Sequence, residues 1–427
     1  MSMKRIAVLG TLDTKGLEHA YLASCIRDHG HDVLMVDVGG YGEPSTRPDI
    51  DATTVAAAAD VDLAALRAQG DRGLLVEALT RAAPVLLARL FAEGRIDGVV
   101  SLGGSGGTAI ATSAMRALPT GFPKLMVSTV ASGNVAPYVG VRDIVMFPSI
   151  VDVAGLNRFS RGAFRRAAAA ICGMVEAGAS ADDDGAPLIV ASMFGNTSVC
   201  VEHARTALEH RRYEVVVFHA TGTGGRAMES LVESGSVSGV LDITTTEWAD
   251  ELVGGVLSAG PARLEAAARN GVPAVVAPGC LDMVNFGAPE TIPERFSSRR
   301  FYRHNPQVTL MRTTPAECAE LGRIVAEKVN LSTGLVTVLI PLKAISIISA
   351  AGQPFHDPDA DQALFAALRQ HLRTDIPFVE VDAAINDAAF AESCVAALLD
   401  NMDRSNPVAA RNAAWSPPAR HGAEPQA

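Results

Sequence analysis

The sequence has few aromatic residues and no excess of positive charge. The first shortage indicates the composition of the interior, and the second excludes a class of partner. Aromatic residues make up 5% of the 427 residues, whereas hydrophobic residues make up 48%. The apolar interior therefore consists mainly of alanine, valine, leucine and isoleucine, which is typical of parallel sheets covered by helices. The formal net charge is -11. This charge predicts no nucleic acid partner, because phosphate backbones require a basic surface.

Signals for membranes, secretion and metals are missing as well. No stretch is uncharged and apolar over the roughly 20 residues that a membrane-spanning helix needs, so we expect no membrane partner. The first ten residues run into a strand-like segment without the features of a signal peptide. No His-x-x-x-His spacing is present, so no metal site is predicted. The scattered cysteines form no Cys-x-x-Cys pair and predict reduced thiols in a cytoplasmic protein: Cys25, Cys172, Cys200, Cys280, Cys318 and Cys394.

An internal repeat is the clearest feature that the sequence does contain. Residues 6–40 align without a gap against residues 188–222, and each copy has an apolar strand, a polar turn, an amphipathic helix and a second strand. Any two α/β segments share such periodicity, but the gapless match favours a true duplication. Strands that alternate with helices predict right-handed crossovers and a parallel sheet. We therefore expect an α/β fold with two tandem doubly wound, Rossmann-like domains that face each other across a cleft.

Composition marks the expected boundaries. The stretch AGASADDDGAP, at residues 177–187, has the small residues, acids and proline of a linker. The chain after residue 403 is rich in proline, alanine and polar residues, which is typical of disorder. The predicted organisation is a nucleotide-binding domain at 1–178, a linker at 179–187, a second Rossmann-like domain at 188–402 and a disordered tail at 403–427.

Ligands of open parallel sheets bind beyond the carboxyl ends of the strands, so the turns at those ends are the candidate sites. The first turn follows the first strand and offers hydroxyls, backbone amides, a lysine and carboxylates, which suit a nucleotide or its magnesium ion. It fits neither a Rossmann fingerprint nor a Walker A loop. The alternative is that Asp13 or Thr14 only caps the helix. The candidate binding residues here are Gly10, Thr11, Asp13 and Lys15.

The second turn carries four glycines around a serine, which lets a ligand approach the backbone closely. Each glycine costs about 0.5–1 kcal/mol relative to alanine, and a plain turn needs only one. We therefore predict phosphate binding by Gly103, Gly104, Ser105, Gly106, Gly107 and Thr108. A third turn is expected beside it, with Ser128, Thr129, Ser132 and Gly133. Asp37 ends the second strand where Rossmann folds place a ribose-binding acid, although a capping aspartate explains it equally well.

The second domain carries a different set of polar residues after its strands. Histidine and glutamate suit acid–base chemistry, and arginine suits the fixation of an anion. A histidine at a strand end is, however, more often a structural residue. The catalytic candidates are His219, Glu247, Asp282, His304 and Arg312.

Several motifs in the same order resemble the tomato mosaic virus resistance protein-like ATP-binding family, which has many bacterial members. The resemblance extends from residue 4 to about residue 370. Its motifs are GTLDTKGLE at 10–18, GGSGGT at 103–108, LPTGFPKLMVSTVASG at 118–133, DVAGLN at 152–157, FHATGTGGRAM at 218–228, LDITTTEWAD at 241–250, DMVNFG at 282–287 and HNPQVTLMRT at 304–313.

The resemblance implies two Rossmann-like subdomains, ATP as the ligand and a homodimer; the residues of the first turn suit a magnesium ion bound with that ATP. Plant members carry an additional barrel-like domain, which a separate protein would have to supply here. Three hypotheses of function remain open. The chain binds a nucleotide beside the cleft, or it is an enzyme that acts on a small phosphorylated or carboxylated metabolite with acid–base groups from the second domain. Alternatively, it is a non-catalytic regulatory or scaffold subunit.

Overall fold

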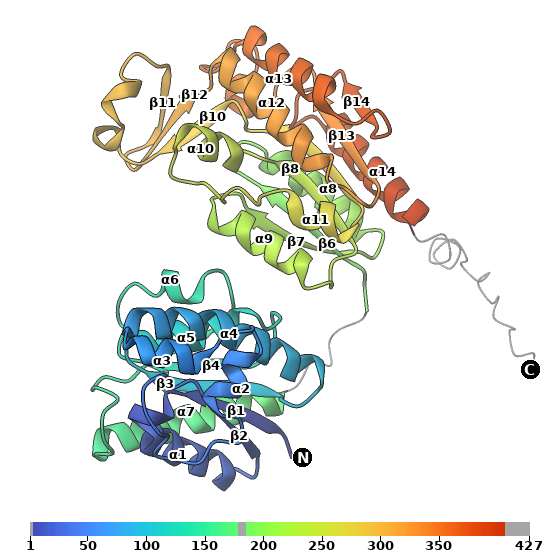
Figure 1. Ribbon diagram of the computed structural model, residues 1–427. Coiled ribbons are helices and arrows are strands. Elements are labelled where there is room, and N and C mark those ends of the chain that lie inside the picture. Colours follow the sequence, from blue (N-terminus) through green and yellow to red (C-terminus); the bar gives the residue numbers. More distant parts are fainter. Residues whose placement is uncertain (1–2, 178–184, 406–427) are drawn as a thin grey trace, which may run out of the picture. The chain divides into compact units, whose positions relative to one another are not determined.

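The computed structural model of the protein describes residues 3–177 and 185–405 (Figure 1). The chain separates into two compact units, residues 1–183 and residues 184–427, and each is described by itself. Most of the predicted linker and of the predicted tail lies outside the described residues. The last helix continues to Ser405, beyond the predicted start of the tail at 403.

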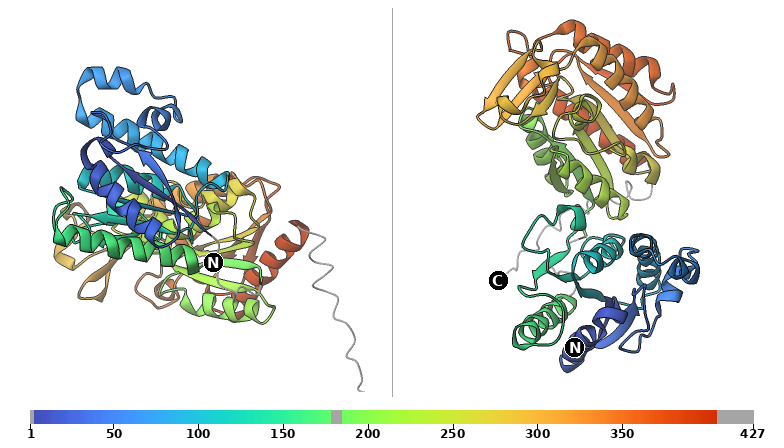
Figure 2. Two further views of the ribbon diagram at one scale, coloured as in Figure 1. Left: turned by 90° about the horizontal axis from the view of Figure 1, so that it is seen from below. Right: turned by 60° about the vertical axis from the view of Figure 1, so that its left-hand side comes forward.

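The first unit is built on a five-stranded parallel sheet with the strand order β2-β1-β3-β4-β5. One core cluster lies on the face that α1 and α7 cover, and another lies on the face of α2, α4 and α5 (Figures 1 and 2). The strands are β1 (Arg5–Gly10), β2 (Asp32–Asp37), β3 (Gly98–Gly103), β4 (Lys124–Ser128) and β5 (Val145–Pro148). The helices are α1 (Leu12–Asp28), α2 (Ala52–Ala57), α3 (Leu63–Gln69), α4 (Arg72–Ala92), α5 (Ser105–Arg116), α6 (Ala136–Val139) and α7 (Arg158–Ala177).

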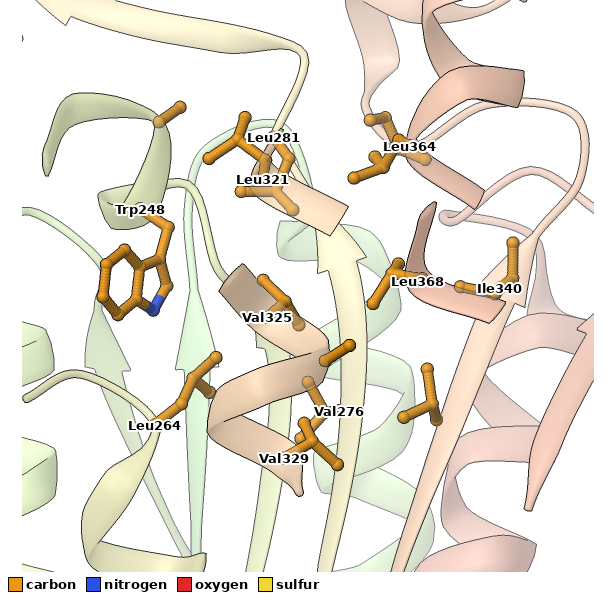
Figure 3. Close-up of a cluster of buried hydrophobic side chains, with 14 of the residues drawn as sticks. Trp248, Leu264, Val276, Leu281, Leu321, Val325, Val329, Ile340, Leu364 and Leu368 are labelled. Carbon is orange, nitrogen blue, oxygen red and sulfur yellow. The ribbon is translucent and has the colours of Figure 1, made fainter. Parts of the chain in front are cut away.

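The second unit has a six-stranded parallel sheet with the order β14-β13-β9-β8-β6-β7. Helices α8 and α14 pack on one face, and the others pack on the opposite face around Trp248, Leu281 and Val325 (Figure 3). The strands are β6 (Leu188–Met193), β7 (Glu214–His219), β8 (Gly239–Thr244), β9 (Ala274–Gly279), β13 (Val336–Pro341) and β14 (Phe378–Val381). The helices are α8 (Ser198–Glu209), α9 (Thr223–Glu233), α10 (Glu247–Val253), α11 (Glu265–Asn270), α12 (Pro315–Val329), α13 (Pro358–His371) and α14 (Ala388–Ser405).

The predicted fold class is confirmed, because both units are doubly wound α/β structures with parallel sheets. The repeat is visible in the strand order, since β2-β1-β3-β4 of the first sheet corresponds to β7-β6-β8-β9 of the second. The gapless alignment pairs residues 32–37 with residues 214–219, and these are the bounds of β2 and β7.

A small antiparallel sheet in the second unit was not predicted from the sequence. Its strands are β10 (Met283–Phe286), β11 (Phe301–Asn305) and β12 (Val308–Arg312), in the order β10-β12-β11. His304 and Arg312 therefore lie on strands of this sheet.

The sequence predicts neither a membrane-spanning helix nor disulfide bonds. No helix in residues 3–177 or 185–405 is long and apolar enough to cross a bilayer. All six cysteines are buried and free of disulfides.

Candidate functional site

A cavity of about 470 Å³ opens at the carboxyl ends of β1, β2 and β3 in the first unit. The first and second predicted turns both line it, so the structure brings them together. Residues that the sequence did not single out complete the lining, among them several from α4. The lining residues are Thr11, Asp13, Thr14, Lys15, Val38, Gly40, Tyr41, Arg72, Leu75, Val76, Leu79, Gly103, Gly104, Ser105, Gly106, Gly107, Ile110 and Asp152.

Helix α5 begins at this cavity with unbonded backbone amides. Gly104 occupies the N-cap position and has no side chain to cap the helix. The first helical bond runs from the Thr108 N–H to the Gly104 carbonyl, over 2.9 Å. The N–H groups of Ser105, Gly106 and Gly107 have no acceptor within the described residues. Since a helix N-terminus also carries partial positive charge, these amides suit an anion.

Three glycines of this turn are not needed by the fold. A Cβ at Gly104 would lie 3.9 Å from its nearest neighbour, and at Gly106 and Gly107 the nearest neighbour would be 4.0 Å away. None of the three has a positive φ. Gly103 differs, because its Cβ would approach the Gly107 Cα to 3.2 Å. Packing and backbone conformation therefore leave the other three glycines unexplained, and close approach of a ligand explains them.

The carboxylates of Asp13, in the first turn, and of Asp37, at the end of β2, have different surroundings. Asp37 accepts hydrogen bonds from the N–H groups of Leu12, at 3.0 Å, and Gly39, at 2.8 Å, and it does not line the cavity. Burial raises the pKa of Asp37, and the charge of Asp13 raises it further. Asp37 thus joins β2 to the start of α1, which favours the capping interpretation. Asp13 does line the cavity, and its Oδ2 accepts from the Tyr41 N–H at 2.9 Å.

The remaining residues of the first turn are positioned by packing. The Lys15 ammonium donates to the Val153 carbonyl. Gly10 lies against the ring of His19, since a Cβ at Gly10 would come within 2.0 Å of the His19 Nε2. Burial lowers the pKa of His19 to about 4, so the imidazole is neutral.

The third turn does not line the cavity. Ser128 is buried, and its hydroxyl lies 2.7 Å from that of Thr108. The Thr108 hydroxyl also donates to the Gly104 carbonyl, over 2.7 Å. Ser128 and Thr108 thus hold the glycine turn in place by hydrogen bonds and do not line the cavity. Thr129, Ser132 and Gly133 do not line it either.

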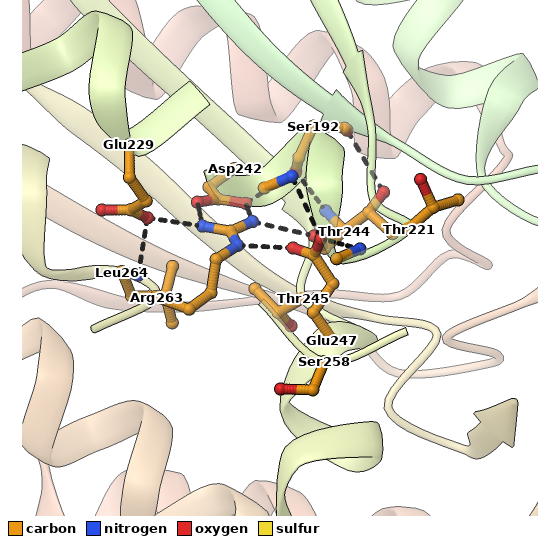
Figure 4. Close-up of polar contacts among 12 residues, drawn as sticks. Ser192, Thr221, Glu229, Asp242, Thr244, Thr245, Glu247, Ser258, Arg263 and Leu264 are labelled. Carbon is orange, nitrogen blue, oxygen red and sulfur yellow. Dashed lines mark hydrogen bonds and ion pairs between the residues drawn. The ribbon is translucent and has the colours of Figure 1, made fainter. Parts of the chain in front are cut away.

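In the second unit, Glu247 belongs to a buried ion cluster (Figure 4). Arg263 is 1% exposed and pairs with the carboxylates of Glu247, Asp242 and Glu229 at 2.7, 2.5 and 3.0 Å. Glu247 also accepts from the N–H groups of Gly222 and Gly225, at 2.6 and 3.1 Å. Its oxygens are therefore bonded to groups of the protein itself. Arg263 was missed from the sequence because it stands in no recognisable motif.

Arg312 and Asp282 make their polar contacts with groups other than Glu247. Arg312 is buried, and its guanidinium binds Asp361 over 2.6 Å and the Phe355 carbonyl over 2.9 Å. Asp282 is also buried and accepts from the Ser346 hydroxyl at 2.8 Å. Burial raises the pKa of Asp282, whereas the charge of Arg312 lowers it. His219 and His304 are exposed.

Asp250, on α10, is expected to make the second unit less stable as the pH rises. Burial raises the pKa of Asp250 from 3.8 to about 7, so the folded state keeps a proton that the unfolded chain releases. Stability then falls as the pH rises between these values, by roughly 2–3 kcal/mol from pH 5 to pH 7. Asp250→Asn should remove this slope in urea unfolding at several pH values.

The neighbouring Asn285 opposes this rise in the pKa of Asp250. Its backbone N–H and its Nδ2 donate to the Asp250 carboxylate over 2.9 and 2.7 Å, which lowers the pKa, but burial has the larger effect. Asp375→Asn, at an exposed aspartate whose pKa is lowered by its bond to Arg373, serves as the control and should leave the slope unchanged. Parallel pH profiles for the wild type and Asp250→Asn would contradict this prediction.

Comparison with known proteins finds close relatives over nearly the whole chain. Models of the uncharacterised protein family UPF0261 match residues 4–180 with its N-terminal domain and residues 186–402 with its C-terminal domain. A UPF0261 protein of Clostridium tetani is 48% identical over 402 residues, which are 94% of this chain and 100% of that protein. A UPF0261 protein of Rhizobium meliloti is 50% identical over 403 residues, 93% of this chain and 99% of that protein.

The resemblance drawn from the motifs is confirmed as a family relation. The ToMV resistance protein Tm-1(GCR237) of Solanum lycopersicum is 37% identical over 436 residues. The match covers 95% of this chain and 56% of the tomato protein. Among solved structures, a putative UDP-N-acetylglucosamine 2-epimerase from Listeria monocytogenes has 10% identity and a TM-score of 0.22, over 65% of this chain and 79% of that one.

Proposed function

The chain belongs to the uncharacterised protein family UPF0261, and we propose that this member binds a phosphorylated small molecule, ATP or a related nucleotide, in the cavity of its first unit. The observation that carries the proposal is the start of α5. Three backbone amides there have no acceptor in the described residues, and two of them belong to glycines that the fold does not need, Gly106 and Gly107. A phosphate group supplies the oxygens that such amides bind.

The second unit provides an internal contrast. Its α9 also begins with glycines, but the N–H groups of Gly222 and Gly225 bind the Glu247 carboxylate. At the start of α9, the anion that the backbone amides bind is therefore a side chain of the protein itself. No carboxylate is bonded to the first turn of α5 within the described residues, which supports an external anion at this position.

The charged residues around the cavity balance one another and fit a nucleotide that carries a magnesium ion. Asp13 and Asp152 contribute two carboxylates, and Lys15 and Arg72 contribute two positive charges. The Arg72 guanidinium has no hydrogen-bond or ion-pair partner in residues 3–177 and is exposed, so it is available to a phosphate. Carboxylate and hydroxyl oxygens are the ligands that Mg²⁺ prefers, and Asp13, Asp152 and Thr11 would hold it. When bound, the ion would neutralise phosphate charge beside the two aspartates.

Titration calorimetry of the full chain with ATP and magnesium tests the proposal. We expect binding that Gly104→Val weakens at least about tenfold, because the new side chain covers the amides, and each lost bond to a charged group costs roughly 1.5–3 kcal/mol. The fold should tolerate this change, since the space around Gly104 is open. An unchanged affinity would contradict the site.

Gly195→Val is the matched control. Gly195 lies in the turn after β6, at a strand end of the second unit, and a Cβ there meets no atom within 4 Å. This variant is expected to bind ATP like the wild type. If only this control lost affinity, the site would belong to the second unit instead.

A further inference from the structure

The cavity has an aliphatic side, which we call the aliphatic wall. Four of its five residues are about 1% exposed and belong to the core cluster between the sheet and helices α2, α4 and α5, and the fifth, Val76, packs against that cluster. The wall is therefore the cavity-facing surface of a packed core, and its shape is fixed by that packing. It consists of Val38, Leu75, Val76, Leu79 and Ile110.

The aliphatic wall offers no side-chain hydrogen bonds to a ligand. Two hydroxyls occur near it on the same helices, and both are turned onto backbone carbonyls. The Thr80 hydroxyl donates to the Val76 carbonyl over 2.7 Å, and the Ser113 hydroxyl donates to the Thr80 carbonyl over 2.9 Å. The Val38 N–H is also used, since it donates to the Gly10 carbonyl over 2.8 Å.

The wall begins directly beside the unbonded amides of α5. A Cβ at Gly106 would lie 4.0 Å from the Val76 Cγ2, and a Cβ at Gly40 would lie 3.3 Å from that of Leu75. A ligand with its phosphate on Gly106 therefore has aliphatic side chains within reach of its organic part. A polar edge buried there loses water without gaining a partner, and each unpaired donor or acceptor lowers affinity by roughly 5- to 150-fold.

We propose that the aliphatic wall selects the organic part of the ligand by apolar contact and desolvation, without reading a pattern of hydrogen bonds. This inference rests on the proposed function, since it concerns the group attached to the bound phosphate. Guanine brings a carbonyl, a ring N–H and an amino group to the wall, whereas adenine brings an amino group and ring nitrogens. An adenine nucleotide is therefore the preferred nucleotide ligand, and its amino group does not increase affinity.

Calorimetry of the full chain with four magnesium-loaded probes tests this inference. We expect ATP to bind more tightly than inorganic tripolyphosphate and at least about tenfold more tightly than GTP. Purine riboside triphosphate, which lacks the amino group, should bind at least as tightly as ATP. Tighter or equal binding of GTP, or tenfold weaker binding of purine riboside triphosphate, would overturn the inference. So would ATP that binds no better than tripolyphosphate, although the phosphate site would then stand.

A matched pair of variants on α4 links the effect to the wall. Leu79→Ala should weaken ATP binding several-fold and leave tripolyphosphate binding unchanged. Leu86→Ala removes an equally buried leucine from the same helix and core cluster, away from the cavity, and should leave both affinities unchanged. Equal ATP affinities in the two variants would overturn the role of the wall. Absence of binding by all four probes to the wild type would overturn the proposed function and this inference with it.

Discussion

Replacing Gly106 with alanine is expected to stabilise the first unit and, at the same time, to weaken its ligand. Gly106 is the second residue of α5, its φ is not positive, and an added Cβ has 4.0 Å of clearance to Val76. Alanine in a helix is favoured over glycine by about 0.5–1 kcal/mol. The melting temperature of the ligand-free protein should therefore rise by roughly 1–4 °C.

Ligand affinity should change in the opposite direction in the Gly106→Ala variant. The methyl group would stand at the unbonded amides, where it keeps phosphate oxygens from reaching them. We expect ATP affinity to fall by about tenfold, which corresponds to the loss of one bond to a charged group. Calorimetry with ATP and magnesium measures this fall, and a thermal melt without ligand measures the stability.

The control is another helical glycine with open space around it. Gly173 lies within α7, a Cβ there would meet no atom within 4 Å, and it does not line the cavity. Gly173→Ala should stabilise the protein to a similar extent without any change in affinity. If Gly106→Ala also left the affinity unchanged, its glycine would have no role in binding.

The alternation of strands and helices was readable from the sequence because each parallel strand is a short, nearly continuous apolar run. Both copies of the repeat show this, and the alignment of residues 32–37 with 214–219 fits the bounds of β2 and β7. The small antiparallel sheet was missed for the converse reason. Its strand β10 has only four residues and follows β9 after a short turn, so its sequence resembled a strand-end loop.

The candidate site was predictable where the signal is local. The glycines of the second turn stand together in the sequence, and their cost indicates a role without reference to the rest of the chain. The aliphatic wall was not predictable in this way. Leu75 and Leu79 look like ordinary core residues of an amphipathic helix, and only the fold brings the same side chains to a cavity.

Hydrogen-bond partners are a further property that a sequence does not display. Asp37 ends a strand and Glu247 comes shortly after one, as site residues often do. In the structure their oxygens accept from backbone N–H groups of Leu12 and Gly39 in one case and of Gly222 and Gly225 in the other. Whether an acid at a strand end faces a ligand or the protein depends on contacts between segments far apart in the chain.

Loss of Arg263 is expected to have the largest effect on stability of any single change considered for the second unit. Its guanidinium pairs with the half-buried carboxylate of Glu229 on α9 and with two buried carboxylates, from β8 and from the first residue of α10. Arg263→Met keeps much of the side-chain volume but leaves those carboxylates without their cation. Breaking a buried ion pair by removing one partner costs about 3–5 kcal/mol, so the melting temperature of this unit should fall by roughly 6–20 °C.

A surface arginine of the same unit gives the comparison. Arg269 pairs with Glu265 one helical turn away, and its side chain is 61% exposed, so Arg269→Met should cost about 0.5 kcal/mol or less. Similar melting temperatures for the two variants would mean that Asp242, Glu247 and Glu229 are satisfied without Arg263.

The same Arg263→Met variant also tests whether ATP binding depends on the second unit. Every residue that lines the cavity belongs to the first unit, and Arg263 lies outside it. ATP binding below the melting transition should therefore remain close to that of the wild type, although the second unit has lost several kcal/mol of stability. If calorimetry on this variant showed that ATP binding had disappeared at a temperature where both units remain folded, the nucleotide site would depend on the second unit. The proposal of a site built from the first unit alone would then be wrong.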